Sequence, residues 1–152
     1  MERALFVLRD DDSNENLLRD AGELASGVDA ELVVLTLLTV DELETGLDTL
    51  ETIADIEQTG YDESMVLKSA ITSIETLIEE TFPDSDVRCK AVAKVHEGSD
   101  EAEAIIEAGE EYNCDHVFMS GRKRSPTGKV VFGDTTQAVL LNFDGRVTVE
   151  LV

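Results

Sequence analysis

The chain has 152 residues, 34 of them acidic and 12 basic, with a formal net charge of -22 and 42% apolar residues. This length and apolar content predict a single domain over residues 1–152 with its own core, and the charge argues against nucleic acid or an anionic membrane as a partner. No apolar run approaches the roughly 20 residues that span a bilayer, so we expect a cytoplasmic protein. The carboxylate excess is typical of a halophilic protein in molar salt, where the Debye length is about 3 Å. An acidic mesophilic protein is the alternative.

Five short apolar runs predict β-strands. Their β-branched residues and lack of strict alternation indicate strands covered on both faces, as in a parallel sheet. The runs are residues 4–8, 32–38, 92–95 with a lead-in from 87, 117–119 and 146–152.

Two helices are predicted in the first half of the chain. The first follows Asp12 or Ser13 as N-cap and ends at Gly27. Its apolar positions are Leu17, Leu18, Ala21, Leu24 and Ala25. The second is longer, repeats apolar residues at intervals of three and four, and closes at Pro83. Its apolar positions are Leu67, Ile71, Ile74, Ile78 and Phe82.

Two more helices are predicted in the second half. One begins near Ser99 with acidic residues in its first turn, which complement the helix dipole. The other begins at Gly133 or Asp134 and runs to a turn at residues 142–145. Residues 41–62 have weak periodicity and are interpreted as a mobile lid or a short helix, with solvated surface as the alternative.

The alternation of strands and helices, with right-handed crossovers, predicts an α/β fold: a three-layer, doubly wound domain with a five-stranded parallel sheet. In such sheets ligands bind beyond the carboxyl ends of the strands, where the strand order reverses. We therefore look for functional residues just after each predicted strand.

Four of the twelve cations, Arg122, Lys123, Arg124 and Lys129, lie within nine positions after the fourth predicted strand. A cationic, glycine-punctuated segment between a strand and a helix indicates a phosphate site, and hence nucleotide binding. The alternative is that these cations form ion pairs with the surrounding carboxylates. Asp10 follows the first strand and is a candidate hydrogen-bond acceptor for a base or ribose.

Common nucleotide motifs and catalytic or metal sites are not indicated. The spacing around Gly128 is not that of a P-loop, and the glycines do not follow the first strand as in the Rossmann fingerprint. Cys89 and Cys114 have no metal-ligand spacing and are interpreted as buried, reduced thiols. His96 and His116 are strand-associated and interpreted as structural, so no catalytic residue is assigned and an enzyme is not expected, although weak ATP hydrolysis stays open.

The chain resembles the universal stress protein family in the arrangement typical of haloarchaeal members. The resemblance rests on residues 4–10, 115–121, 132–133 and 147–152, together with the long middle helix. It implies an adenine nucleotide alpha hydrolase-like sheet with strand order 3-2-1-4-5.

Sequences of the ATP-binding branch of that family resemble one another in a motif of Gly, two residues, Gly, about nine residues, then Gly-Ser or Gly-Thr. Gly121 and Gly133 match the outer glycines, Arg124 replaces the middle one, and Asp134 replaces the hydroxyl residue. A carboxylate beside a triphosphate is repulsive unless K⁺ or Mg²⁺ offsets it. Thr135 supplies a hydroxyl if the register shifts by one.

The resemblance implies a small nucleotide-binding module with a stress-response role and a homodimer through the C-terminal strand. ATP, with or without Mg²⁺, is the preferred ligand, and AMP or another nucleotide stays open. A non-ATP-binding structural or interaction module with an unknown protein partner is the alternative. The residues expected to contact nucleotide are Asp10, Leu38, Gly121, Arg122, Arg124, Gly133, Asp134 and Thr135.

Overall fold

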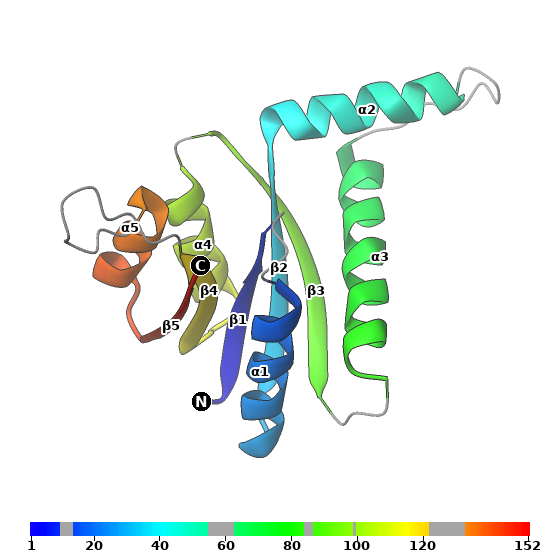
Figure 1. The fold of residues 1–152 in the computed structure, drawn as a ribbon. Coiled ribbons are helices and arrows are strands. Elements are labelled where there is room, and N and C mark those ends of the chain that lie inside the picture. Colours follow the sequence, from blue (N-terminus) through cyan, green and yellow to red (C-terminus); the bar gives the residue numbers. More distant parts are fainter. Residues whose placement is uncertain (10–13, 55–62, 84–86, 99, 122–132) are drawn as a thin grey trace.

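The computed structural model describes residues 1–9, 14–54, 63–83, 87–98, 100–121 and 133–152 (Figure 1). Its strands form one five-stranded sheet in the order β3-β2-β1-β4-β5, and every neighbouring pair is parallel. The predicted doubly wound α/β fold and its strand order are confirmed. The strands are β1 (Arg3–Leu8), β2 (Glu31–Thr39), β3 (Arg88–His96), β4 (His116–Gly121) and β5 (Arg146–Leu151).

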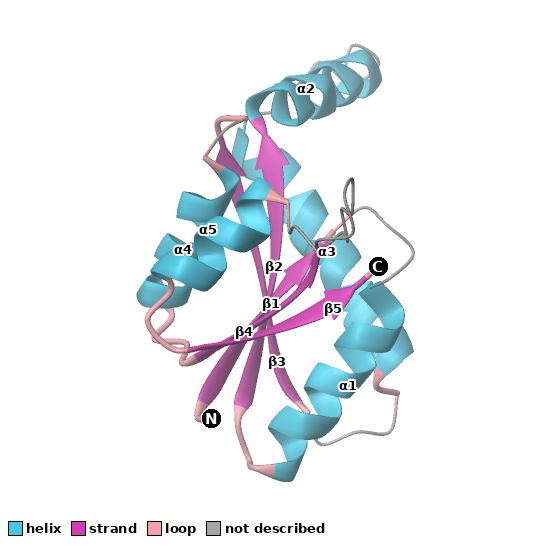
Figure 2. Cartoon of the chain, turned by 60° about the vertical axis from the view of Figure 1, so that its left-hand side comes forward, coloured by secondary structure: helices cyan, strands magenta, loops and turns pink. Residues whose placement is uncertain are grey.

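Helices cover both faces of the sheet, as the view along it in Figure 2 shows. One face carries α1 (Asn14–Gly27) and α3 (Glu63–Thr81), and the other carries α4 (Glu101–Glu111) and α5 (Asp134–Asn142). Side chains of β1 alternate between two cores: Phe6 packs with the α1 side and Leu5 with the α4 side. Since both cores are fully apolar at β1, the central strand reads as a continuous apolar run.

Helix α1 differs in one respect from its predicted apolar face. Leu18, Ala21 and Ala25 are fully buried, but Leu24 is 56% exposed. At 100° per residue, Leu24 lies at the margin of the stripe centred on the other three, and it sits close to the end of the helix. Leu24 is therefore not a core residue.

The first part of segment 41–62 forms a helix, which is one of the structures predicted for it. Helix α2 (Val40–Ala54) continues directly from β2 and extends over the start of α3 (Figure 1). The Thr39 hydroxyl accepts a hydrogen bond from the Glu42 N–H at 3.1 Å, which caps the first turn. Residues 55–62 lie outside the described part of the chain.

At the amino edge of the sheet, short connections and an ion pair link the starts of β1, β2, β4 and β5, whereas a cavity of about 510 Å³ lies between the ends of α1 and α3, beside the start of β3. Arg3 donates to the Tyr112 carbonyl at 2.7 Å and pairs with Glu31 at 3.3 Å. The predicted turn after α5 brings Gly145 so close to this edge that an added Cβ would lie 2.7 Å from the Asp115 carbonyl oxygen. The turn therefore packs directly against the connection that precedes β4.

The histidines lie in β3 and β4, as predicted, and of the two cysteines predicted to be buried only Cys114 is fully so. Cys89 is half-buried, Cys114 is buried, and both are free thiols whose pKa burial raises to about 11. His116 stacks on Phe118 with ring centroids 4.4 Å apart, and its Nε2 lies 2.7 Å from the Thr148 hydroxyl. Desolvation lowers the His116 pKa below its ordinary value. Within the described residues, no helix is long and apolar enough to cross a membrane.

Candidate functional site

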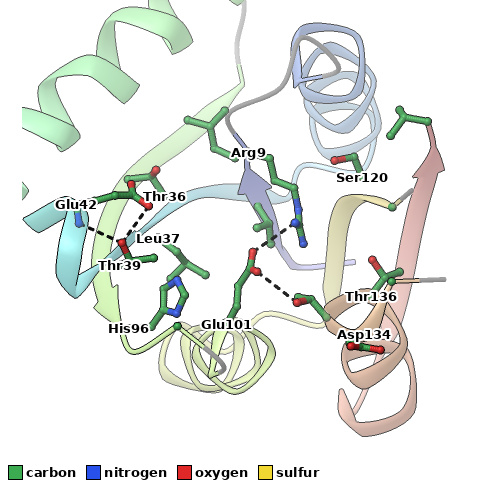
Figure 3. A pocket seen from close by; sticks show the side chains of 17 residues that line it. Arg9, Thr36, Leu37, Thr39, Glu42, His96, Glu101, Ser120, Asp134 and Thr136 are labelled. Carbon is green, nitrogen blue, oxygen red and sulfur yellow. Dashed lines mark hydrogen bonds and ion pairs between the residues drawn. The ribbon is translucent and has the colours of Figure 1, made fainter. Parts of the chain in front are cut away.

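A cavity of about 590 Å³ lies at the carboxyl ends of the strands (Figure 3). Its walls come from the ends of β1, β2, β3 and β4 and from the first turns of α2, α4 and α5. The strand order reverses between β1 and β4, so this is the crevice in which doubly wound sheets bind ligands. The volume lies in the range of small-molecule sites.

Four of the residues predicted to contact nucleotide line this cavity: Gly121, Gly133, Asp134 and Thr135. Gly121 ends β4, and the other three form the start of α5. The sheet topology therefore brings the two outer glycines of the sequence pattern to one wall. Asp10, Arg122 and Arg124 lie outside the described residues, as do Lys123 and Lys129.

Leu38 does not line the cavity; from β2, the lining residues are Thr36, Leu37 and Thr39. Successive side chains of a strand point to opposite faces, and Leu37 is the one that packs with the core under α4. Thr36, on the same face of β2 as Leu38, does line the cavity, so the alternation of side chains does not by itself exclude Leu38.

The two glycines serve different purposes. A Cβ on Gly121 would lie 2.9 Å from Val149 and 3.1 Å from the Thr136 hydroxyl, so the absence of a side chain there allows α5 and β5 to pack on β4. A Cβ on Gly133 would meet nothing within 4 Å. Of these two glycines, Gly133 is the one at which the space left by the missing side chain is open to a ligand.

The start of α5 offers hydrogen-bond donors to the cavity. Gly133 is the N-cap in extended conformation and, as a glycine, has no side chain with which to cap the helix. The first N–H groups of a helix have no partner within it, and the helix dipole favours an anion or hydrogen-bond acceptor there. The hydroxyls of Ser120, Thr135 and Thr136 line the cavity beside them.

Glu101, in the first turn of α4, connects three elements at the cavity (Figure 3). Its Oε1 pairs with Arg9 Nη1 at 3.4 Å, just beyond β1, and its Oε2 accepts a hydrogen bond from the Thr135 hydroxyl at 3.3 Å. The sequence assigned Glu101 only to the dipole of its helix. The missed signal was topological, because all helices after parallel strands begin at the same sheet edge.

The opposite wall combines apolar and polar groups. Leu37 and Val7 provide apolar surface, and Glu42 and His96 provide polar groups. The His96 Nδ1 lies 2.9 Å from the Glu97 carbonyl. Within the described residues, His96 and His116 bond to a carbonyl and to Thr148, and neither is bonded to Ser120, so these groups do not form a nucleophile–base pair.

Comparison with known proteins decides the family. The model of the Universal stress protein family matches residues 1–149. The chain belongs to the universal stress protein family. No curated protein matches it by sequence.

Solved universal stress proteins share the fold at low sequence identity. One from Archaeoglobus fulgidus has 20% identity and a TM-score of 0.63, covering 98% of this chain and 97% of its own. Another, from the same organism in complex with dAMP, has 14% identity and a TM-score of 0.59, with 98% and 96% covered. A universal stress protein in complex with cAMP has 12% identity and a TM-score of 0.60, with 99% and 96% covered.

Proposed function

We propose that this universal stress protein binds an adenine nucleotide in the cavity at the carboxyl ends of its strands. The observation that carries the proposal is the start of α5, where the N-cap Gly133 has no side chain and leaves open space beside helix N–H groups. Two proteins of the same fold are described as complexes with cAMP and dAMP, which supports an adenine nucleotide as the ligand class.

The described residues fit the parts of such a ligand. The N–H groups of the α5 start and the Thr135 hydroxyl suit a phosphate oxygen, Val7 and Leu37 offer apolar surface to a base, and carboxylates such as Glu42 accept hydrogen bonds from hydroxyl or amino groups. We keep ATP with Mg²⁺ among the expected ligands. The cation would offset the charge of Glu101 and Asp134 near the phosphates.

Calorimetry with AMP and ATP, in molar KCl with and without Mg²⁺, tests the proposal. Thr135→Val removes a cavity hydroxyl, and Thr72→Val removes an exposed hydroxyl that bonds within α3, which makes it the matched control. We expect saturable binding to the wild type and to Thr72→Val, weakened about fivefold or more in Thr135→Val because a hydrogen bond is lost. Absence of saturable binding to the wild type contradicts the proposal and favours an interaction module.

The proposed molecule is a single-domain cytoplasmic homodimer that regulates a stress response by binding rather than catalysis. Strand β5 lies at the sheet edge, and its end exposes Leu151 by 43% and Val152 by 49%. An exposed apolar edge favours pairing with a second copy. A bound nucleotide would order groups at the cavity and change the surface offered to a protein partner.

Sedimentation velocity tests the dimer. Leu151→Asp adds a charge at the β5 edge, whereas Leu141→Asp adds the same charge on α5, where Leu141 is 74% exposed. We expect a dimer for the wild type and for Leu141→Asp, and a monomer for Leu151→Asp. A monomeric wild type, or a Leu151→Asp protein that stays dimeric, contradicts the β5 interface.

A further inference from the structure

We propose that Glu101 determines how many phosphates the cavity accepts. It selects nucleosides and monophosphates over polyphosphates whenever no divalent cation accompanies the ligand. This inference rests on the proposed nucleotide site and adds the charge class of its ligand.

The first step is the position of Glu101. Its two carboxylate oxygens separately engage Arg9 and Thr135, at 3.4 and 3.3 Å, and so hold a guanidinium and a hydroxyl that an anionic ligand would use. Figure 3 shows the carboxylate pointing into the cavity between Arg9 and the first turn of α5. Glu101 thus takes the place of an anion at this wall.

The second step is the accessibility of the pair. The side chains of Arg9 and Glu101 are only 26% and 29% exposed. Charges in such a partly desolvated position interact more strongly with a nearby ligand than fully exposed ones do. A phosphate that approaches Arg9 must therefore displace Glu101 or lie beside its charge.

The third step is the charge of the remaining wall. The described residues that line the cavity include one guanidinium, that of Arg9, and three carboxylates, those of Glu42, Glu101 and Asp134. Every additional phosphate adds repulsion from these groups, while ribose hydroxyls and a base amino group donate hydrogen bonds to them. These lining residues thus favour a ligand of low negative charge.

The test measures a ratio of affinities. Calorimetry without Mg²⁺ gives the dissociation constants of adenosine, AMP and ATP for the wild type, for Glu101→Gln and for Glu103→Gln. Glu103 lies in the same first turn of α4, is exposed and does not line the cavity, so its variant carries the same charge change. We expect Glu101→Gln to raise the affinity for ATP relative to adenosine by about tenfold, and Glu103→Gln to change it by less than about twofold.

The ratio separates selectivity from folding, because a merely destabilising change weakens all three ligands together. Equal ratios in the two variants, with adenosine or AMP still bound, overturn the role of Glu101 and leave the nucleotide site intact. Failure of the wild type to bind any of the three overturns the proposed function and this inference with it. If Glu101→Gln does not fold, Glu101→Ala makes the same comparison.

Discussion

Both edges of the sheet carry an Arg–Glu ion pair, but the two pairs lie in different surroundings. At the amino edge Arg3 pairs with Glu31 at 3.3 Å and donates to the Tyr112 carbonyl. At the carboxyl edge Arg9 pairs with Glu101 at 3.4 Å, and a cavity of about 590 Å³ remains beside them. An Arg–Glu pair therefore does not by itself mark a site; the space and the backbone groups around it do.

The difference follows from the direction of parallel strands. Chain segments entering the amino edge come from helix ends through tight turns, where Asp29 and Asn113 adopt φ of 57° and 55°. Segments leaving the carboxyl edge lead to helix starts, whose first N–H groups lack partners within the helix. Tight turns place backbone at the amino edge before β2 and β4, while helix starts give the carboxyl edge donors for a ligand.

The largest predicted effect is a loss of stability on substitution of Gly145, in the turn before β5 at the amino edge of the sheet. Gly145→Ala would bring a Cβ to 2.7 Å from the Asp115 carbonyl oxygen, and we expect a loss of about 2–3 kcal/mol in the free energy of unfolding. Urea denaturation measures it. Gly27→Ala is the control, since a Cβ there meets nothing within 4 Å. A similar stability for both variants would show that the amino edge is looser than described.

A smaller loss is predicted for the glycine that ends β4. Gly121→Ala places a Cβ 2.9 Å from Val149 and close to Thr136, and overpacking of this kind costs about 1–2 kcal/mol. The same urea titration measures it. An unchanged midpoint would mean that β5 and α5 shift freely, and that Gly121 is present for the ligand rather than for packing.

Gly133→Ala sharpens the comparison from the ligand side. A Cβ meets nothing within 4 Å there, so we expect stability to fall by no more than about 1 kcal/mol, the scale on which Ala is a poorer N-cap residue than Gly. AMP affinity is expected to fall about tenfold, since the Cβ takes space at the α5 start. Calorimetry and urea denaturation on one preparation measure both quantities. Full AMP affinity in this variant would exclude close approach at Gly133.

The smallest effect predicted is a pH dependence of the free energy of unfolding that arises from His116, at the amino end of β4. The His116 pKa is lowered mainly by desolvation, with further lowering by Arg146 and the N-terminus and an opposing effect of Asp115. The unfolded chain therefore binds a proton more readily than the fold, so His116 stabilises the protein above its unfolded pKa and loses that contribution as the pH falls through the folded pKa.

Urea denaturation of the wild type and His116→Gln at several pH values tests this sign. The stability of the wild type relative to the variant should decrease as the pH falls below about 6.5, the ordinary histidine value. His96→Gln serves as the control for loss of a histidine. A difference that is constant with pH would show that His116 titrates alike in the folded and unfolded chain.

Much of the fold follows from local sequence patterns, because buried parallel strands need continuous apolar runs and Gly or Pro ends the helices between them. The sequence also predicted that Gly121, Gly133 and Thr135 lie near one another, since they adjoin the fourth strand and the fourth predicted helix. The contact of Arg9 with Glu101 could not be predicted from the sequence, because 92 positions separate them and only the strand order brings them together. Leu38 is absent from the cavity lining, although Leu37 and Thr39 on either side of it belong to that lining.

The most direct test of the account is an NMR titration of the ¹⁵N-labelled protein with AMP, following the backbone amides at both edges of the sheet. The account predicts saturable shifts at the carboxyl edge, for Arg9, Gly121 and Thr135, and none at the amino edge, for Arg3 and Asp115. Shifts at the amino edge, or none at either edge, would contradict the claim that the carboxyl edge is the ligand site.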